Sequence, residues 1–597
     1  MKIKVSKYIA NFFVDHGMSD IFTVTGGGAM HLNDSFGHQE GLKCTFNHHE
    51  QACAIAAEGY ARLTGKVAGV CVTSGPGGTN AITGVLGGWQ DSIPMFIVSG
   101  QVKKETTTWS TRVPLRQLGD QEFQIVECIK TMTKYAYMIT EPNEIRYHLE
   151  KAWYLCQYGR KGPVWLDIPS DIQAAIVETN ELMKFDIKEI NAGETPVYDK
   201  ALTPVIIGRI ERAKRPVILA GTGIRLSGAY DEFIQLADKL KIPIVTAWNA
   251  HDLLWDEHPF YCGRPGTVGT RGGNFIVQNS DLLIVLGCRM NIRQISYNYK
   301  GFAKKAFKIV VDIDEAELCK PTVCVDMPIH ADAADVMRDL LDARYEYNDK
   351  HTDWLLWCRN VNAKYPATLP EYYEKKTPVN PYVFITELSN QMVEGDKVVT
   401  GNGSACVIGF QSMNIKRKQR LFTNSGCAAM GYGFPAAIGC CVAIPGERII
   451  CLDGDGSFQM NIQELQTVVY NKLNLKLFIL NNGGYHSIRQ TQMNIFEPPL
   501  VGVSDGNGIS FPDMEKIAYA YGIPYVEIDT LETIKERIGE ALEKEGPVIC
   551  EVFCDPEQIF QPKLSSKVLS DGTMVSPEID DMYPFLSRKE YESNKLD

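Results

Sequence analysis

Short apolar runs without polar alternation recur along this chain, and they constrain its fold more than any other feature. Each run ends in glycine or a small polar residue and is followed by a stretch with helical spacing. The clearest runs are Val67–Ser74, Met95–Gly100, Val217–Gly221, Leu282–Gly287, Ile309–Asp314, Lys397–Gly401, Ile449–Asp453 and Lys476–Asn481. Such runs are typical of strands buried on both faces of a parallel sheet. The predicted fold is α/β, with doubly wound parallel sheets and ligands at the carboxyl ends of the strands.

The length of 597 residues is too great for one hydrophobic core. Two polar stretches, Glu178–Lys200 and Tyr345–Lys376, divide the chain into three blocks. The predicted domains are an N-terminal domain at 1–175, a central domain at 201–342 and a C-terminal domain at 376–555, followed by a C-terminal arm at 556–597. The arm is rich in proline, serine and charged residues.

Charge and cysteine content exclude several classes of protein. The net charge of -12 argues against nucleic acid as a partner. No window approaches 18 uninterrupted apolar residues, so no membrane span is expected. The first residues, with Val5, Ile9 and Phe13 at helical spacing, predict an amphipathic helix rather than a signal peptide. The 17 cysteines form no CxxC pair and lie mostly in apolar runs, which indicates free thiols in a reducing, cytoplasmic compartment.

The most specific motif is Gly454-Asp455-Gly456-Ser457, which ends one apolar run and is followed by a helical stretch and a second run ending in Asn481-Asn482. Mg²⁺ takes few protein ligands, all oxygens, together with phosphate oxygens. Asp455 supplies a carboxylate and Asn482 an amide oxygen. Gly454 and Gly456 let the backbone approach a diphosphate, and Ser457 is expected to start a helix whose amino end favours the anion. A lone Gly-Asp-Gly would be read as a turn; the full arrangement favours a metal and diphosphate site.

This arrangement resembles the thiamine diphosphate motif, which implies that the backbone carbonyl of Gly484 completes the Mg²⁺ ligands. The segment from His48 to Arg62 is similar to a second part of the same family's sequence. The resemblance makes Glu50 the carboxylate that protonates N1′ of the cofactor, so that C2 can lose its proton. Without the resemblance, Glu50 would be read as a helix-capping carboxylate.

Further residues are assigned by the same resemblance. Met430 matches the large side chain that lies beneath the bend of the cofactor. Gln121, thirteen residues before Lys134, matches an active-site glutamine. Gly403 and Ser404 stand where the family binds the diphosphate. Four histidines and a second glutamate are expected to have packing or hydrogen-bonding roles: His31, His48, His49, His486 and Glu58.

The second block is similar to the FAD-binding domain of the acetolactate synthase family, which implies a bound FAD without a redox role. Each of its glycines is also compatible with an ordinary turn at a strand end. The residues assigned to FAD are Gly221, Gly223, Gly263, Gly287, Arg289, Arg293, Asp312 and Asp332.

Over about the first 560 residues the chain resembles the large subunit of acetolactate synthase. The resemblance implies a carboligase that decarboxylates pyruvate and transfers the two-carbon unit to a carbonyl acceptor. It also implies a homodimer or homotetramer, in which the domain of Glu50 faces the diphosphate-binding domain of a neighbouring chain.

The chain departs from that family where the branched-chain enzymes carry Gln-Trp, because it has Gln490-Thr491 there. This change suits a wider or more polar acceptor pocket. A keto-sugar nucleotide acceptor, as in yersiniose biosynthesis, is therefore an alternative to a second pyruvate. An α-keto acid decarboxylase, a pyruvate oxidase and a non-catalytic paralogue are further alternatives. The presence of Glu50, Gln121, Asp455 and Asn482 together argues against the last of these.

Overall fold

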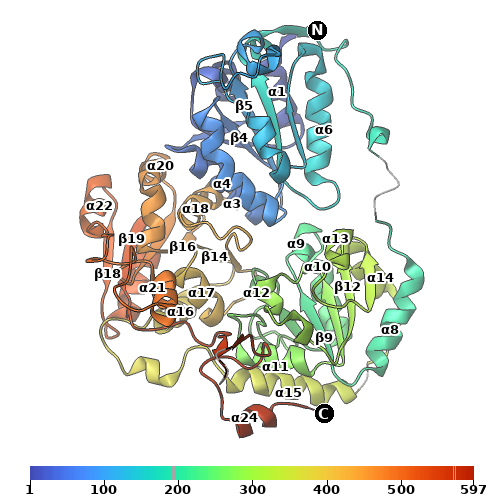
Figure 1. Ribbon diagram of the computed structural model, residues 1–597, viewed down its shortest axis with the longest axis vertical. Coiled ribbons are helices and arrows are strands. Elements are labelled where there is room, and N and C mark those ends of the chain that lie inside the picture. Colours follow the sequence, from blue (N-terminus) through green and yellow to red (C-terminus); the bar gives the residue numbers. More distant parts are fainter. Residues whose placement is uncertain (191–195, 348, 569–570, 572, 597) are drawn as a thin grey trace.

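A computed structural model of the chain describes residues 1–190, 196–347, 349–568, 571 and 573–596. It has three α/β domains, each built on a parallel sheet with helices on both sides (Figure 1). The N-terminal domain lies at the top of the view, the central domain at the lower right and the C-terminal domain at the lower left. The predicted fold class is confirmed.

The N-terminal sheet has the strand order β3-β2-β4-β5-β7-β6, with all neighbouring strands parallel. Its strands are β2 (Asp20–Thr23), β3 (Lys43–Phe46), β4 (Ala68–Val72), β5 (Met95–Gln101), β6 (Tyr135–Met138) and β7 (Val164–Pro169). Its main helices are α1 (Val5–Asp15), α2 (Met30–Gly37), α3 (Glu50–Thr64), α4 (Pro76–Gln90) and α6 (Ile145–Gln157). A short strand β1 (Lys2–Lys4) precedes α1 and pairs antiparallel with β8 (Ile176–Glu178).

The C-terminal sheet repeats this topology, with the order β15-β14-β16-β17-β19-β18. Its strands are β14 (Lys397–Thr400), β15 (Arg420–Phe422), β16 (Ile449–Gly454), β17 (Leu475–Asn481), β18 (Tyr525–Ile528) and β19 (Val548–Phe553). Its main helices are α16 (Pro381–Gln391), α17 (Ser404–Ser412), α18 (Gly433–Ala443), α20 (Leu465–Asn471), α21 (His486–Ile495), α22 (Met514–Tyr521) and α23 (Ile534–Glu543).

The central sheet is five-stranded and parallel, in the order β10-β9-β11-β12-β13. Its strands are β9 (Pro216–Ala220), β10 (Ile244–Thr246), β11 (Leu282–Leu286), β12 (Phe307–Asp312) and β13 (Met327–His330). Its main helices are α8 (Thr203–Arg212), α10 (Tyr230–Leu240), α11 (Arg271–Asn279) and α14 (Ala333–Asp342), and α15 (Lys350–Lys364) connects it to the third domain. Each of the eight apolar runs predicted as strands overlaps a strand of one of the three sheets.

Helix α3 of the N-terminal domain packs against helix α18 of the C-terminal domain, and glycines permit the close approach. A Cβ on Gly59 would lie 2.4 Å from the carbonyl oxygen of Ala436, and a Cβ on Gly439 would lie 1.9 Å from that of Ala56. No side chain fits at such distances. The two outer domains are therefore joined within one chain by a backbone-to-backbone contact.

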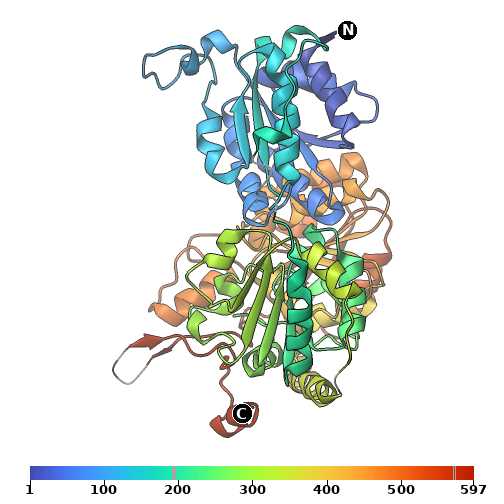
Figure 2. The ribbon, with the colours of Figure 1, turned by 90° about the vertical axis from the view of Figure 1, so that its right-hand side faces the viewer.

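The C-terminal arm returns to the central domain and covers helix α11, whose nine residues are all buried. Arg271 donates to the carbonyl of Met582 at 3.0 Å, and Asn274 donates to the carbonyl of Ile579 at 2.9 Å. Figure 2 shows the arm running below the central domain, with a short hairpin that projects away from the body. The described residues 579–582 of the arm therefore pack directly on the central domain.

Every one of the 17 cysteines is a free thiol, and most are buried, as the sequence predicts. Over the described residues, no helix combines the length and apolar character that a bilayer crossing requires.

Candidate active site

A cavity of about 690 Å³ lies at the carboxyl ends of strands β14, β16 and β17. The strand order reverses between β14 and β16, and parallel sheets bind ligands at such a reversal. The residues predicted for the diphosphate, the metal and the bend of the cofactor all line this one cavity: Gly403, Ser404, Met430, Gly454, Asp455, Gly456, Ser457, Asn482 and Gly484.

Asp455 and the turn that follows β17 meet inside the cavity. The Asp455 carboxylate accepts hydrogen bonds from the backbone N–H of Gly456 at 2.8 Å and of Gly484 at 2.9 Å. Burial is the main cause that raises its pKa to about 6. Asn482 donates from Nδ2 to Ser404 Oγ at 3.1 Å, while its buried Oδ1 has no hydrogen-bond partner. A buried carboxylate beside an unpaired amide oxygen could hold a divalent cation.

The glycines around the cavity have two different functions. A Cβ on Gly403 or Gly454 would meet no atom within 4 Å, so both leave open space on the cavity side. A Cβ on Gly456 would instead lie 2.3 Å from the ring of Tyr485. Gly456 is thus required for packing, which differs from the sequence argument that it clears space for a diphosphate.

The predicted start of a helix at Ser457 was wrong. Helix α19 (Asp455–Phe458) has only four residues and begins two residues earlier, and the Ser457 hydroxyl accepts from the N–H of Gly431 at 2.9 Å. Helix α17, nine residues long, begins at Ser404 and presents its amino end to the cavity. The helix terminus available to an anion is therefore that of α17.

His486 lines the same cavity but is already engaged. Arg489 donates to its Nδ1 at 2.9 Å, and its Nε2 lies 2.9 Å from the carbonyl oxygen of Gln558. Burial and the Arg489 charge lower its pKa to about 4, so the ring is neutral. Gln490 is buried beside it, whereas the Thr491 side chain is exposed and outside the cavity lining.

Glu50 and Gln121 lie together in the N-terminal domain. Asn80 donates to the Glu50 carboxylate at 3.0 Å, and a Cβ on Gly77 would lie 3.4 Å from that carboxylate. Two residues away, a Cβ on Gly75 would lie 2.5 Å from the backbone oxygen of Gln121. The glycine turn after β4 thus places both predicted catalytic residues on one surface.

The loop that carries Gln121 is held by its neighbour Glu122. The buried Glu122 carboxylate accepts from the N–H and hydroxyl of Thr108, at 2.8 and 2.7 Å, and from the N–H of Leu118 at 2.9 Å. Gln121 itself has a φ of 60°. Glu122 therefore ties the segments at Thr108 and Leu118, both N-terminal to Gln121, to the residue next to Gln121.

The two groups of predicted catalytic residues do not share a cavity within one chain. No described residue of the N-terminal domain is among those lining the C-terminal cavity. The loop around Gln121 is also unusually apolar at its surface. Its exposed large side chains are Trp109, Val113, Leu115, Leu118 and Phe123. In Figure 2 this loop projects from the top of the N-terminal domain. Exposed apolar side chains gathered on one loop are typical of surfaces that contact other molecules.

Sequence reasoning missed several residues of the C-terminal cavity. The central domain contributes Thr267 and Arg293, and the arm contributes Phe560, Lys563 and Ser566. Arg293 was assigned to FAD, yet it lines this cavity and stacks 5.3 Å from the ring of Trp248. The arm residues follow no motif, so only their folded position identifies them.

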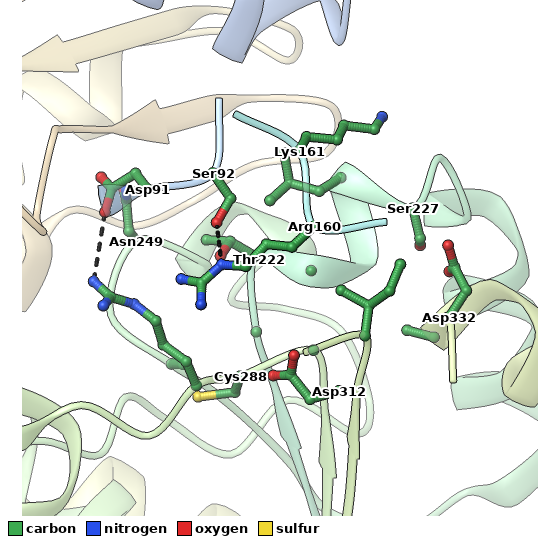
Figure 3. A pocket seen from close by; sticks show the side chains of 18 of the residues that line it. Asp91, Ser92, Arg160, Lys161, Thr222, Ser227, Asn249, Cys288, Asp312 and Asp332 are labelled. Carbon is green, nitrogen blue, oxygen red and sulfur yellow. Dashed lines mark hydrogen bonds and ion pairs between the residues drawn. The ribbon is translucent and has the colours of Figure 1, made fainter. Parts of the chain in front are cut away.

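A second cavity, of about 330 Å³, lies where the central domain meets the N-terminal domain (Figure 3). Of the residues assigned to FAD, six line it: Gly221, Gly223, Gly287, Arg289, Asp312 and Asp332. Gly263 lies outside, where a Cβ would meet the side chain of Asn362 at 2.4 Å. A Cβ on Gly221 would meet the backbone of Gly287 at 2.2 Å, so these glycines pack two strand-end turns together.

The second cavity carries charges of both signs. From the N-terminal domain come Arg160, which donates to Ser92 Oγ at 2.9 Å and pairs with Asp314 at 2.8 Å, and the half-buried Lys161 (Figure 3). Burial raises the pKa of Asp312 to about 6. Carboxylates at strand ends can bind ribose hydroxyls, and neighbouring cations can bind phosphates. The cavity could therefore hold a nucleotide.

Comparison with known protein families agrees with this geometry. Residues 3–126 match the N-terminal TPP binding domain of thiamine pyrophosphate enzymes, residues 205–340 match their central domain, and residues 401–552 match their C-terminal TPP binding domain. The fold and the site thus define a thiamine pyrophosphate enzyme.

Relatives that align over most of their length indicate which family of thiamine pyrophosphate enzymes the chain resembles. The chain is 32% identical to a probable acetolactate synthase large subunit of Methanococcus aeolicus, over 90% of this chain and 89% of the relative. It is 31% identical to the acetolactate synthase large subunit of Lactococcus lactis, over 95% of both chains. It is 29% identical to the large subunit of acetolactate synthase isozyme 1 of Escherichia coli, over 93% and 95%. The chain belongs to the acetolactate synthase large subunit family.

Proposed function

We propose that this protein is a thiamine diphosphate- and Mg²⁺-dependent carboligase. It removes CO₂ from pyruvate and joins the remaining two-carbon unit to a second carbonyl compound. The observation that carries the proposal is the meeting of Asp455 with the Asn482–Gly484 turn, beside an unpaired buried amide oxygen. Incubation with pyruvate, Mg²⁺ and thiamine diphosphate should release CO₂ and yield a ligation product, identified by mass spectrometry. A protein that releases no CO₂ under these conditions would contradict the proposal.

The residues present fit the cofactor and its metal. Asp455, the Asn482 amide oxygen and the Gly484 carbonyl would hold Mg²⁺, and the amino end of α17 at Ser404 would face the diphosphate. Thiamine diphosphate supplies a nucleophilic C2 carbon at which an α-keto acid can lose CO₂. Glu50 would hold the proton at N1′, and Met430, 40% exposed in the cavity, would support the bend between the two rings.

We further propose that each active site is shared between two chains of a homodimer. This is supported by the separation of Glu50 and Gln121 from the C-terminal cavity and by the exposed apolar loop 109–123. A two-fold arrangement would cover that loop and build two equal sites from one self-complementary contact. A homotetramer would be a pair of such dimers.

A mixing experiment tests the shared site. We expect inactive Glu50→Gln and inactive Asp455→Ala proteins to regain activity after subunit exchange, because each hybrid dimer has one site with both residues intact. Random exchange should restore about a quarter of the wild-type rate, since half of the dimers are hybrids with one good site. Native mass spectrometry must confirm the hybrids. Confirmed hybrids that stay inactive, beside an exchanged wild-type control that survives, would place the site within a single chain.

FAD is the proposed ligand of the second cavity. Asp312 and Asp332 would bind ribose hydroxyls, and Arg160 and Lys161 the diphosphate. Trp248 and Asn249 of the central domain and Ser425 of the C-terminal domain line the same cavity and would help to hold the flavin. The 17 free thiols support our proposal that the enzyme works in the cytoplasm.

The colour of the purified protein tests the FAD assignment. We expect flavin absorption bands that pyruvate does not bleach under anaerobic conditions, because the proposed carboligation transfers no electrons to the flavin. Lys161→Met should lower flavin occupancy, whereas Lys184→Met, at an exposed position outside both cavities, should not. A colourless, active wild type would remove FAD from the site. Rapid bleaching by pyruvate would indicate an oxidase.

A further inference from the structure

A buried carboxylate of the C-terminal domain holds the segment that precedes helix α3. This carboxylate belongs to Glu464, the last residue of the short 3₁₀ turn η12 (Gln459–Glu464). It accepts hydrogen bonds from Asn47 Nδ2 at 2.9 Å, from the backbone N–H of His48 at 3.0 Å and from the hydroxyl of Thr467 at 2.7 Å. A carboxylate is costly to bury unless several donors satisfy it, and here two of the three donors come from the N-terminal domain.

Asn461, in the same turn, contacts the residue that follows Glu50. Its Nδ2 donates to Gln51 Oε1 at 3.2 Å and to the backbone carbonyl of Gly431 at 2.8 Å. Asn461 is fully buried, and its φ of -133° interrupts the helical backbone of the turn. A Cβ on Gly431 would lie 2.8 Å from the Asn461 amide nitrogen, so only glycine fits there. One side chain thus connects the neighbour of Glu50 with the neighbour of Met430.

Turn η12 therefore contacts the chain on both sides of Glu50. The amino end of α3, where Glu50 lies, has no side-chain cap of its own. Neither Glu464 nor Asn461 lines the C-terminal cavity, so any effect of these residues on the cofactor must pass through their neighbours. A displacement of about 1 Å at a reacting group can cost about 100-fold in rate. The position of the Glu50 carboxylate is thus sensitive to these contacts.

We propose that Glu464 and Asn461 are positioning residues that act through Glu50. They hold the segment at 47–51 so that the Glu50 carboxylate can hold the proton at N1′ of the cofactor. This inference rests on the proposed role of Glu50. It also has a consequence for the proposed dimer. Because η12 and Glu50 belong to the same chain, the domain that positions Glu50 in one active site forms the cavity of the other.

The test measures H/D exchange at C2 of the bound cofactor in Glu464→Ala and in Asn461→Ala. We expect exchange to slow roughly 10- to 100-fold in each variant, as for a catalytic group shifted by up to about 1 Å. The affinity for thiamine diphosphate at fixed Mg²⁺, measured by calorimetry, should stay close to that of the wild type, because neither residue lines the cavity. Gln466→Ala, at an exposed position of α20, is the matched control and should exchange normally.

Two further comparisons separate positioning from general stabilisation. In a Glu50→Gln background, Glu464→Ala and Asn461→Ala should slow exchange little further, because residues that act through one group do not have additive effects. Glu464→Gln should retain most of the exchange rate. Its amide oxygen can accept from His48, and its amide nitrogen can donate to the buried Asn47 Oδ1, which has no hydrogen-bond partner, once the Asn47 amide rotates.

Hybrid dimers test the consequence for the two active sites. The one good site of a hybrid takes Glu50 from the Asp455→Ala chain. Glu464→Ala should therefore slow turnover when it is placed on that chain and not when it is placed on the Glu50→Gln chain. Equal losses from either chain would show that Glu464 acts through the whole fold and not through Glu50.

Three other results would overturn the inference. These are normal exchange in both alanine variants, additive losses in the Glu50→Gln background, and a loss of cofactor affinity as large as the loss of exchange. If Glu464→Ala does not fold, Asn461→Ala decides the question by the same measurements. The proposed function is tested separately, because wild-type exchange in Glu50→Gln would contradict the role of Glu50 itself, and a wild type without CO₂ release from pyruvate would contradict the carboligase activity.

Discussion

Replacing Glu50 with glutamine should reduce turnover by roughly 10²- to 10⁴-fold, the usual contribution of a positioned acid–base group. Glutamine keeps the shape of the side chain, and its amide oxygen can still accept the 3.0 Å hydrogen bond from Asn80. It cannot hold the exchangeable proton that the proposed role at N1′ requires. The half-buried position of Glu50 at the start of α3 leaves the fold independent of its charge. Thermal unfolding and cofactor affinity should therefore remain close to those of the wild type.

The decisive measurement is H/D exchange at C2 of the bound cofactor, because it reports proton removal before any substrate binds. Exchange should slow in Glu50→Gln and remain normal in Glu40→Gln, which changes an exposed glutamate of the same domain. Wild-type exchange in Glu50→Gln would end the assignment. A loss of cofactor affinity of the same size as the loss of turnover would show that Glu50 only helps to bind the cofactor.

The sheets could be predicted because most of their central strands are buried on both faces. Such strands appear in the sequence as continuous apolar runs, which can be identified without knowing the strands they pair with. Strand β16, with five of its six residues buried, is such a case. Short edge strands could not be predicted in the same way. Strand β15 (Arg420–Phe422) has three residues, too few to show any periodicity. The strand β1 at Lys2–Lys4 exists only through its pairing with β8, some 170 residues away, a contact that no local pattern contains.

The metal site was within reach of sequence reasoning because its residues follow consecutive strands of one parallel sheet, and topology alone brings such strand ends together. The part of the C-terminal cavity that Arg293 and Lys563 line could not be predicted in this way. It depends on the hydrogen bond from the N–H of Leu564, in the C-terminal arm, to the carbonyl of Thr267, and these two residues are almost 300 positions apart in the sequence. The role of Gly456 was misjudged for a similar reason, since the ring of Tyr485 that requires it is a neighbour only in the folded protein.

Replacing Asp455 with alanine should remove saturable, Mg²⁺-dependent binding of thiamine diphosphate. Among the described residues that line the C-terminal cavity, Asp455 is the only acidic one. Its loss would leave Mg²⁺ with the Asn482 amide oxygen and backbone carbonyls as ligands. We expect the affinity for thiamine diphosphate to fall by more than about 100-fold. Losing a residue that only supports a metal ligand costs up to about 100-fold, and Asp455 is proposed to be a ligand itself. Calorimetric titration with thiamine diphosphate at fixed Mg²⁺ measures this directly.

Two further variants separate the loss of a ligand from damage to the turn. Alanine also leaves the N–H groups of Gly456 and Gly484 without the acceptor they have in the wild type. The two N–H groups bind different oxygens of the carboxylate, so Asp455→Asn retains an acceptor for one of them and removes the charge. It should lose less thermal stability than Asp455→Ala and still bind the cofactor far more weakly. Asp505→Ala removes an exposed acid two residues beyond Val503, whose carbonyl binds Tyr485, and should bind normally. If Asp455→Asn binds thiamine diphosphate as tightly as the wild type, the Asp455 carboxylate only stabilises the turn at Gly484, and Mg²⁺ must be held by other oxygens.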